Sequence, residues 1–123
     1  MRTAQQLFDQ SVQFLRLQGT KSIVEAIDEQ GNCSCRYRSP NGMKCAIGAL
    51  FEDREYKPAM EGMLVSGLVS SHSLLPERQA EFDRHRYMLG NLQRIHDQIP
   101  VSDWEKQWKM LASDYNLQYI EPK

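Results

Sequence analysis

The chain has 123 residues, of which 41% are hydrophobic and 25% are charged, and its formal net charge is −1. This length predicts one domain with a core that folds without disulfides or metal. The composition excludes an intrinsically disordered chain, and the balanced charge disfavours a protein that coats nucleic acid, since such proteins carry a basic excess. Because the chain shows no signal-peptide pattern and no long apolar run, and has an odd number of cysteines, we expect a cytoplasmic protein without membrane attachment.

The first predicted helix ends near residue 18. Thr3 followed by Gln6 has the form of a capping box, apolar residues then recur at helical spacing, and Gly19 is a typical helix stop. In the next segment, residues 22–30, the apolar residues also fit one helical face. We therefore favour one or two further helical turns that end at Gly31, and a strand that begins at Ser22 is the alternative.

Residues 33–45 predict a short β-hairpin. From Cys33 to Arg38 the residues alternate between two faces, which is typical of a half-buried strand. A Pro-Asn-Gly turn follows at 40–42, and the next three residues would form the returning strand. After the hairpin, residues 46–51 predict a short buried helix.

Proline residues mark the later helices. Pro58 is expected to open a helix that runs to Ser70, and Pro76 precedes the longest predicted helix, at residues 77–98. Ser102 and Glu105 form a second capping box, which would begin the final helix.

These elements together predict an α+β, mainly α fold. About five helices would surround one core, with the β-hairpin at residues 33–45 placed after the first helix. The whole chain, residues 1–123, is expected to form a single compact domain.

Three cysteines, Cys33, Cys35 and Cys45, could bind zinc together with a histidine, because thiolates and imidazole are the ligands of tetrahedral zinc. The Cys-x-Cys spacing differs from that of standard zinc modules. We therefore favour the interpretation that the cysteines are small buried side chains and that no cofactor is bound. The fourth ligand in the zinc alternative would be one of three histidines: His72, His85 or His96.

A cysteine-dependent enzyme is the second alternative. If Cys45 opens a helix beside Lys44, the helix dipole and the ammonium group would lower the pKa of its thiol. His96 would serve as the base, oriented by Asp97 or Asp53. Asp97 is adjacent to His96 in the predicted helix and is expected to point away from it. This weakens the enzyme hypothesis.

A binding surface is the third alternative, and the one that we favour. Turns expose side chains on a rigid base, and basic residues interleaved with aromatic ones can contact a partner. Nucleic acid is the less favoured partner because acidic residues are equally abundant. The expected contacts with a protein partner are Arg36, Tyr37, Arg38, Asn41 and Lys44. In the nucleic-acid alternative, Arg84, Arg86 and Arg94 would join them in a basic patch.

Three segments of the chain carry a resemblance to known sequences: 35–38 (CRYR), 42–50 (GMKCAIGAL) and 56–62 (YKPAMEG). They resemble a group of small uncharacterised proteins from bacteria and their phages, and the likeness extends over most of the chain. The resemblance implies that Cys35 and Cys45 belong together and that Cys33 is incidental. It also implies that several polar residues meet Cys45 around one pocket: Tyr37, Arg38, Tyr56, Glu61, His96 and Asp97.

From these observations we expect an accessory protein, encoded by a phage or prophage, that binds and modulates a bacterial macromolecule. The expectation of binding without catalysis depends on the missing catalytic pattern around the cysteines. The phage context depends on the resemblance alone.

Overall fold

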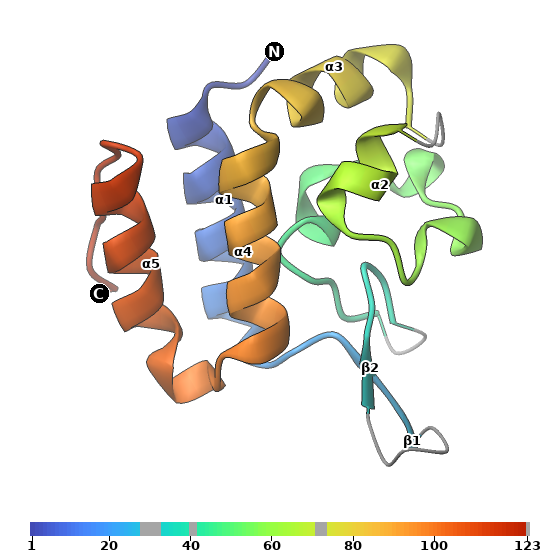
Figure 1. Cartoon of the computed structure of the whole chain (residues 1–123). Helices are drawn as coiled ribbons and strands as arrows, with labels where there is room; N and C mark the ends of the chain where they lie inside the picture. The colour runs from blue at the N-terminus through green and yellow to red at the C-terminus, as the bar shows by residue number, and fades with distance from the viewer. Residues whose placement is uncertain (28–32, 40–41, 71–73, 123) are drawn as a thin grey trace.

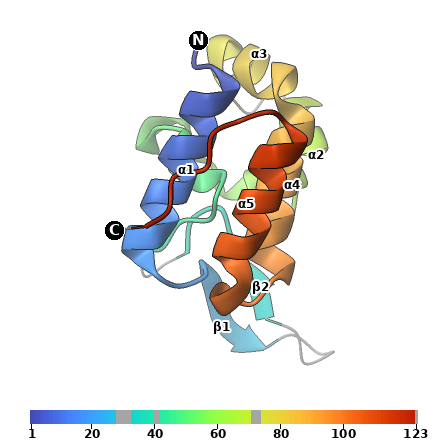
Figure 2. The same cartoon turned by 90° about the vertical axis from the view of Figure 1, so that its left-hand side faces the viewer.

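A computed structural model of the chain describes residues 1–27, 33–39, 42–70 and 74–122. The fold is mainly helical, and Figures 1 and 2 show α1, α4 and α5 packed lengthwise, with α3 across one end. The α-helices of the described residues are α1 (Ala4–Gln18), α2 (Val65–Ser70), α3 (Pro76–Arg84), α4 (Arg86–Gln98) and α5 (Trp104–Asp114).

Short elements connect these helices. Two strands lie at the end of the molecule opposite α3, and four 3₁₀ turns shape the loops (Figure 1). No helix of the described ranges is long and apolar enough to cross a bilayer. The short elements are β1 (Ile23–Ile27), β2 (Cys33–Cys35), η1 (Gly48–Leu50), η2 (Asp53–Glu55), η3 (Pro58–Met60) and η4 (Val101–Asp103).

The first helix forms as predicted from its capping residues. The Gln6 N–H donates to the Thr3 hydroxyl oxygen at 3.1 Å, and the Thr3 N–H donates to the Gln6 side chain at 2.9 Å. At the other end Gly19 adopts a left-handed conformation with φ of +70°, and its N–H bonds to the Leu15 carbonyl. Both helix ends therefore follow from local sequence.

The predicted α+β fold with a hairpin at residues 33–45 is wrong. β2 pairs instead with the preceding β1, in an antiparallel arrangement, so a strand also replaces the helical turns expected in residues 22–30. Beyond β2 the described backbone forms only an isolated bridge between Arg38 and Lys44. The predicted turn at residues 40–41 lies outside the described residues.

The predicted returning strand is reduced to this bridge, beside which the Ser39 N–H donates to the Met43 carbonyl at 2.9 Å and the Cys45 N–H donates to the Tyr37 carbonyl at 3.2 Å. The N–H of Tyr37 donates to one carboxylate oxygen of Glu61 at 2.8 Å, and the N–H of Arg38 donates to the other at 3.2 Å. The Tyr37 N–H is the donor that a longer ladder with the returning segment would use, and Glu61 takes it instead. Glu61 is 23 or more residues away in sequence, so no local sequence pattern predicts this contact.

Two predicted helices are broken in the structure. The helix expected at Pro58–Ser70 is divided into η3 and α2 by Gly62, whose φ of +84° is incompatible with a continuing helix. The helix expected at residues 77–98 is divided into α3 and α4 at His85, which has φ −114° and ψ 22°.

The capping box predicted for the final helix is also absent. α5 follows the 3₁₀ turn η4, so its N-cap is Asp103, and the Asp103 side chain makes no capping hydrogen bond. The Ser102–Glu105 pattern has the residue types of a capping box but not its register, because the 3₁₀ turn moves the helix start by one residue. Instead, Glu105 accepts hydrogen bonds from Arg16 of α1.

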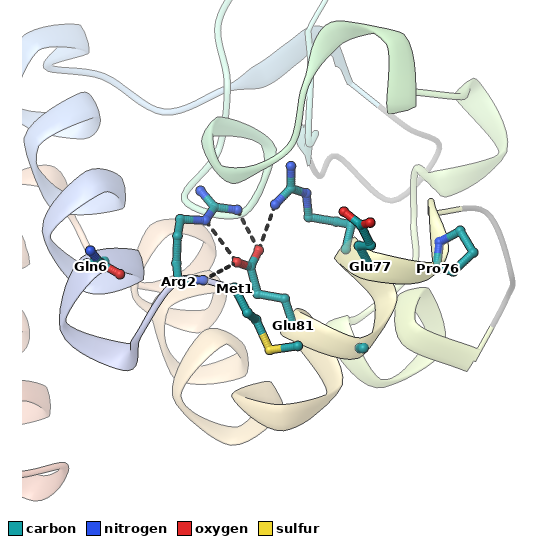
Figure 3. Close-up of a pocket in the computed structure, with 8 residues that line it drawn as sticks. Met1, Arg2, Gln6, Pro76, Glu77 and Glu81 are labelled. Atoms are coloured by element: carbon teal, nitrogen blue, oxygen red, sulfur yellow. Dashed lines mark hydrogen bonds and ion pairs between the residues drawn. The ribbon is translucent and has the colours of Figure 1, made fainter.

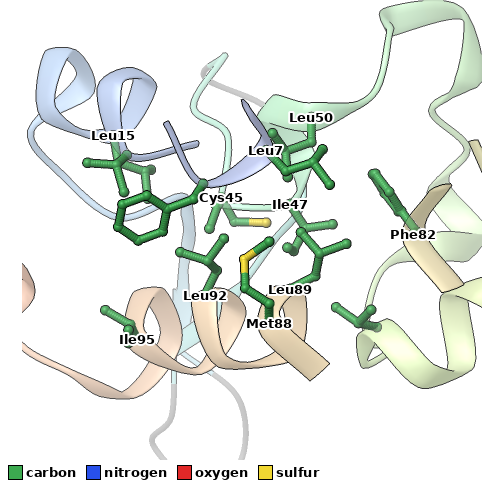
Figure 4. Packing of buried hydrophobic residues seen from close by; sticks show 14 of the residues in the cluster. Leu7, Leu15, Cys45, Ile47, Leu50, Phe82, Met88, Leu89, Leu92 and Ile95 are labelled. Atoms are coloured by element: carbon green, nitrogen blue, oxygen red, sulfur yellow. The ribbon is translucent and has the colours of Figure 1, made fainter. Parts of the chain in front are cut away.

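The core lies between α1 and α4, with the segment after β2 filling the space between them (Figure 4). Leu7 and Leu15 of α1 are almost fully buried, as are Leu89 and Leu92 of α4. Burial of each such side chain stabilises the fold by about 2 kcal/mol. Ile47 is equally buried and reaches the same cluster, which ties the loop after β2 to the helices.

The C-terminal segment is tied to α1 through polar contacts, and Figure 2 shows it crossing that helix. The Gln5 side chain both accepts from the Gln118 N–H at 2.8 Å and donates to the Gln118 carbonyl at 3.1 Å. Arg16 donates to the Ile120 carbonyl at 2.8 Å. These contacts hold an irregular segment in place without strand pairing.

Gly48 lies where two backbone segments meet. A Cβ atom at this position would stand 1.9 Å from the carbonyl oxygen of Tyr37, closer than any real contact. The oxygen belongs to the backbone and cannot swing away. The loop after β2 can therefore approach Tyr37 only because residue 48 has no side chain.

We expect Gly48→Ala to destabilise the protein by about 3 kcal/mol, because one of the two backbone segments must move. Urea unfolding followed by circular dichroism measures the change. Gly67→Ala is the matched control, since the atom nearest to its new Cβ lies at 3.8 Å. In the middle of α2 this control is expected to be neutral or slightly stabilising. Equal stability of Gly48→Ala and the wild type would contradict the close approach.

A buried ion cluster joins the N-terminal residues to α3 (Figure 3). Glu81 accepts from the Arg2 side chain at 2.7 Å and from the Arg2 N–H at 2.8 Å, and Arg78 donates to it at 2.8 Å. Arg78 also reaches Glu55 at 3.1 Å. Burial alone would raise the pKa of Glu81, but the hydrogen bonds from Arg2 and Arg78 outweigh it and lower the pKa to about 2.

Glu81→Gln is expected to destabilise the protein by about 3 kcal/mol at pH 7, because Arg2 loses its carboxylate partner and Arg78 keeps only Glu55. A depressed pKa stabilises the fold above the ordinary value of 4.5, and this stabilisation is lost as the pH falls toward 2. The difference between wild type and variant should therefore shrink over that range in denaturant titrations. Glu77→Gln, at an exposed site on the same helix, should behave like the wild type. A gap that is independent of pH would exclude the ionic role.

Candidate binding site

Cys45 is a buried thiol. It is 2% exposed, and its sulfur accepts a hydrogen bond from the Gly48 N–H at 3.3 Å. Burial raises the pKa of Cys45 to about 12, whereas the enzyme hypothesis needs a lowered value. The short turn η1, in place of the predicted helix, brings one N–H to the sulfur, which does not compensate for burial.

His96 is fully buried, and both of its ring nitrogens have partners. Nε2 accepts from the Ser22 N–H at 3.0 Å, so the proton lies on Nδ1, which faces Asp97 Oδ1 at 2.8 Å. The expectation that Asp97 points away from His96 is wrong. The ring also stacks on Trp104 at 5.7 Å. This histidine holds the start of β1 against α4 and has no nitrogen left to serve as a base for Cys45.

The zinc alternative depends on side chains that the structure does not describe. Cys33 and Cys35 form β2, but their side chains, like residue His72, lie outside the described part of the chain. In the described part, no group of histidine, cysteine or acidic residues is arranged to hold a metal ion. A zinc site on Cys33 and Cys35 stays a prediction.

Two of the predicted partner contacts also support the fold, and their role in partner binding stays a prediction. Tyr37 is buried, its hydroxyl donates to the Met63 carbonyl, and burial raises the pKa of this phenol. Arg38 pairs with Asp53 and donates to the Phe51 carbonyl at 2.7 Å. These two side chains are withdrawn from the surface.

Arg36, Lys44 and Asn41 are the other predicted partner contacts. Arg36 and Lys44 are partly exposed, and Lys44 lies 3.8 Å from Asp53 and 5.5 Å from the ring of Phe14. Asn41 lies outside the described residues. A role of Arg36 and Lys44 in partner binding stays a prediction.

Some of the residues implied by the resemblance do meet at one place, which we call the polar pocket. It is a cavity of about 100 Å³ with Cys45 in its lining, together with Tyr37, Glu61 and Asp97. His96, Arg38 and Tyr56 are not part of this lining. Glu61 already accepts hydrogen bonds from the Tyr56 hydroxyl at 2.7 Å and from two backbone N–H groups.

A larger hollow lies between α2 and the first half of α4, and we call it the α2–α4 groove. Its volume is about 460 Å³. Leu64 and Tyr87 both line it, and each is 70% exposed. The remaining lining residues are Val65, Ser66, Val69, Ser70, Arg86, Gly90, Asn91 and Gln93.

The wall between the groove and the polar pocket is fixed by Gln93. Its side-chain oxygen accepts from the Val65 N–H at 3.2 Å, and its side-chain nitrogen donates to the Tyr37 hydroxyl at 3.0 Å. Gln93 and Leu64 line both hollows. Hydrogen bonds of Gln93 therefore hold this wall of the groove in place, as is typical of preformed binding sites.

Sequence reasoning missed this groove. Leu64 lies within the helix expected at Pro58–Ser70, but that helix is broken at Gly62 and Leu64 is exposed. Tyr87 lies off the apolar stripe of α4. This position could have drawn attention to it, because a large aromatic residue on a polar helix face needs another explanation.

A third hollow, of about 720 Å³, lies beside the Glu81 ion cluster (Figure 3). The charged groups of that cluster are paired with one another, as described above. The hollow therefore offers fewer unpaired groups to a partner than its size suggests.

Comparisons of the chain with protein-family models, with curated proteins and with solved structures find no match.

The burial of Cys45 predicts that its thiol is inert in the folded protein. At pH 8 a thiol with a pKa of about 12 is ionised to roughly one part in 10⁴. Iodoacetamide labelling of the wild type, mapped by mass spectrometry of its peptides, should leave Cys45 unmodified until guanidinium chloride unfolds the chain. Rapid labelling of Cys45 at pH 7 without denaturant would contradict this prediction and support the enzyme hypothesis.

Proposed function

We propose that this chain acts by binding a protein partner in the bacterial cytoplasm and that the α2–α4 groove is its contact surface. The observation that carries the proposal is the pair Leu64 and Tyr87. Both are large side chains, both are 70% exposed, and both flank the same preformed groove. Apolar side chains gathered around a hollow are typical of interaction sites.

The other exposed apolar residues of the described chain do not share a hollow in pairs: Met1 and Ile120, 74% and 62% exposed, each line a different hollow without a second exposed apolar side chain. Leu17 at the end of α1 is 90% exposed and Met110 on α5 is 53% exposed, but neither lines a described hollow. Single exposed apolar residues are common on proteins and need no explanation. The groove differs because its two exposed side chains share one concave surface with Val65 and Val69.

The chemistry of Cys45 and His96 supports binding rather than catalysis. The thiol is protonated and buried, and both histidine nitrogens have partners within the fold. A catalytic pair would need an accessible nucleophile within hydrogen-bond reach of a free base. The resemblance to small bacterial and phage proteins favours a bacterial host protein as the partner.

The test is affinity capture from bacterial lysate followed by native mass spectrometry, with Leu64→Ser/Tyr87→Ser beside the wild type. We expect a partner in stoichiometric amount with the wild type and about a hundredfold less with the variant, because truncation of two interface anchors costs several kcal/mol. The matched control is Leu17→Ser/Met110→Ser, which removes similar exposed side chains elsewhere. Capture that is equal for both variants would contradict the groove, and no stoichiometric partner for the wild type would contradict the function.

A further inference from the structure

We infer that the occupant of the α2–α4 groove is a protein segment that carries apolar anchor residues flanked by carboxylates. This inference rests on the proposed function and names the chemistry of its partner. It depends on the charges along the walls of the groove, which differ from the charge of the whole chain.

Among the described residues that line the groove, the charged one is Arg86. Between Asp83 and Arg94 the sequence has three arginines and one acidic residue, whereas the formal net charge of the chain is −1. The opposite wall, α2, has the sequence VSGLVS and carries no charge. The positive potential at the groove is therefore not balanced by the helix across from it.

Arg86 lies directly against one of the apolar anchors. Its guanidinium carbon stands 5.0 Å from the centre of the Tyr87 ring, and a guanidinium nitrogen lies 3.3 Å from the Tyr87 hydroxyl. A second nitrogen donates to Asp83 at 3.2 Å. The side chain is about half exposed, so the guanidinium N–H groups that these contacts leave unused can donate to a carboxylate from outside.

Arg94 extends the positive wall along α4. It follows Asn91 by three residues and Tyr87 by seven, which places it on the same side of the helix as those groove residues, and it is exposed. A segment lying along the groove would meet Arg86 near one end and Arg94 near the other. Carboxylates on both sides of an apolar anchor match this arrangement.

The same charges disfavour a second copy of this chain as the occupant. In a two-fold dimer the same patch lies on both subunits, so the arginines of one subunit would face those of the other. Like charges opposed at an interface cost several kcal/mol. Nucleic acid would satisfy the arginines, but its phosphates offer nothing to Leu64, Val65 and Val69 in the groove.

The experiment is a selection from a random peptide library, displayed on messenger RNA, against the immobilised full chain. We expect the enriched peptides to combine aliphatic or aromatic residues with Asp and Glu. Arg86→Glu/Arg94→Glu should weaken their binding by about a hundredfold and shift a new selection toward Lys and Arg. The matched control, Lys106→Glu/Lys109→Glu, makes the same charge change at exposed positions of α5 and should leave binding within about twofold.

The outcomes separate this inference from the proposed function. Enriched peptides that are neutral or basic, and that are lost with Leu64→Ser/Tyr87→Ser, would overturn the charge inference while leaving the groove as a binding site. No enrichment, or peptides that bind the Leu64→Ser/Tyr87→Ser variant equally well, would overturn both. Displacement of acidic peptides by a single-stranded DNA oligonucleotide at equal concentration would assign the arginines to nucleic acid and overturn the inference.

Discussion

The carboxylate of Glu61 is the contact on which the rest of the structure depends. It receives the backbone N–H groups of Tyr37 and Arg38 and the hydroxyl of Tyr56. These N–H groups have a side chain, not a neighbouring strand, as their acceptor. A half-buried carboxylate that accepts several hydrogen bonds is satisfied without a cation partner, so Glu61 can fix the loop after β2 in a mainly helical protein.

From this contact the support extends to the groove. Glu61 places the backbone of Tyr37, the Tyr37 hydroxyl accepts from Gln93, and Gln93 in turn accepts from the first N–H of α2. On its other side the Tyr37 carbonyl lies so close to Gly48 that no side chain fits there. The floor of the α2–α4 groove and the packing of the core thus share Tyr37 as a common support, which makes the groove as rigid as the core itself.

The features that could be predicted from the sequence depend on neighbouring residues. The features that could not be predicted depend on contacts between residues far apart in the chain. The ends of α1 follow from Thr3, Gln6 and Gly19, because capping involves neighbours within a turn. The hairpin at residues 33–45 had suitable alternation and turn residues, but Glu61 competes for its donors from 23 or more residues away. The polar pocket was anticipated in part: Tyr37, Glu61 and Asp97 do line one cavity with Cys45, whereas His96 bonds instead to the backbone of Ser22.

The groove shows why composition is a weak guide to a binding surface. A net charge of −1 describes the whole chain and not the distribution of its charges over the surface. A partner in the proposed groove would meet Arg86, the charged residue of its lining. The same reasoning applies to the cysteines: Cys45 belongs to the most distinctive segment of the sequence, but burial makes it a packing residue. Leu64 and Tyr87, in contrast, remain exposed, although no sequence pattern identified them. Leu64 is exposed because the helix breaks at Gly62, and Tyr87 is exposed because it lies on the polar face of α4.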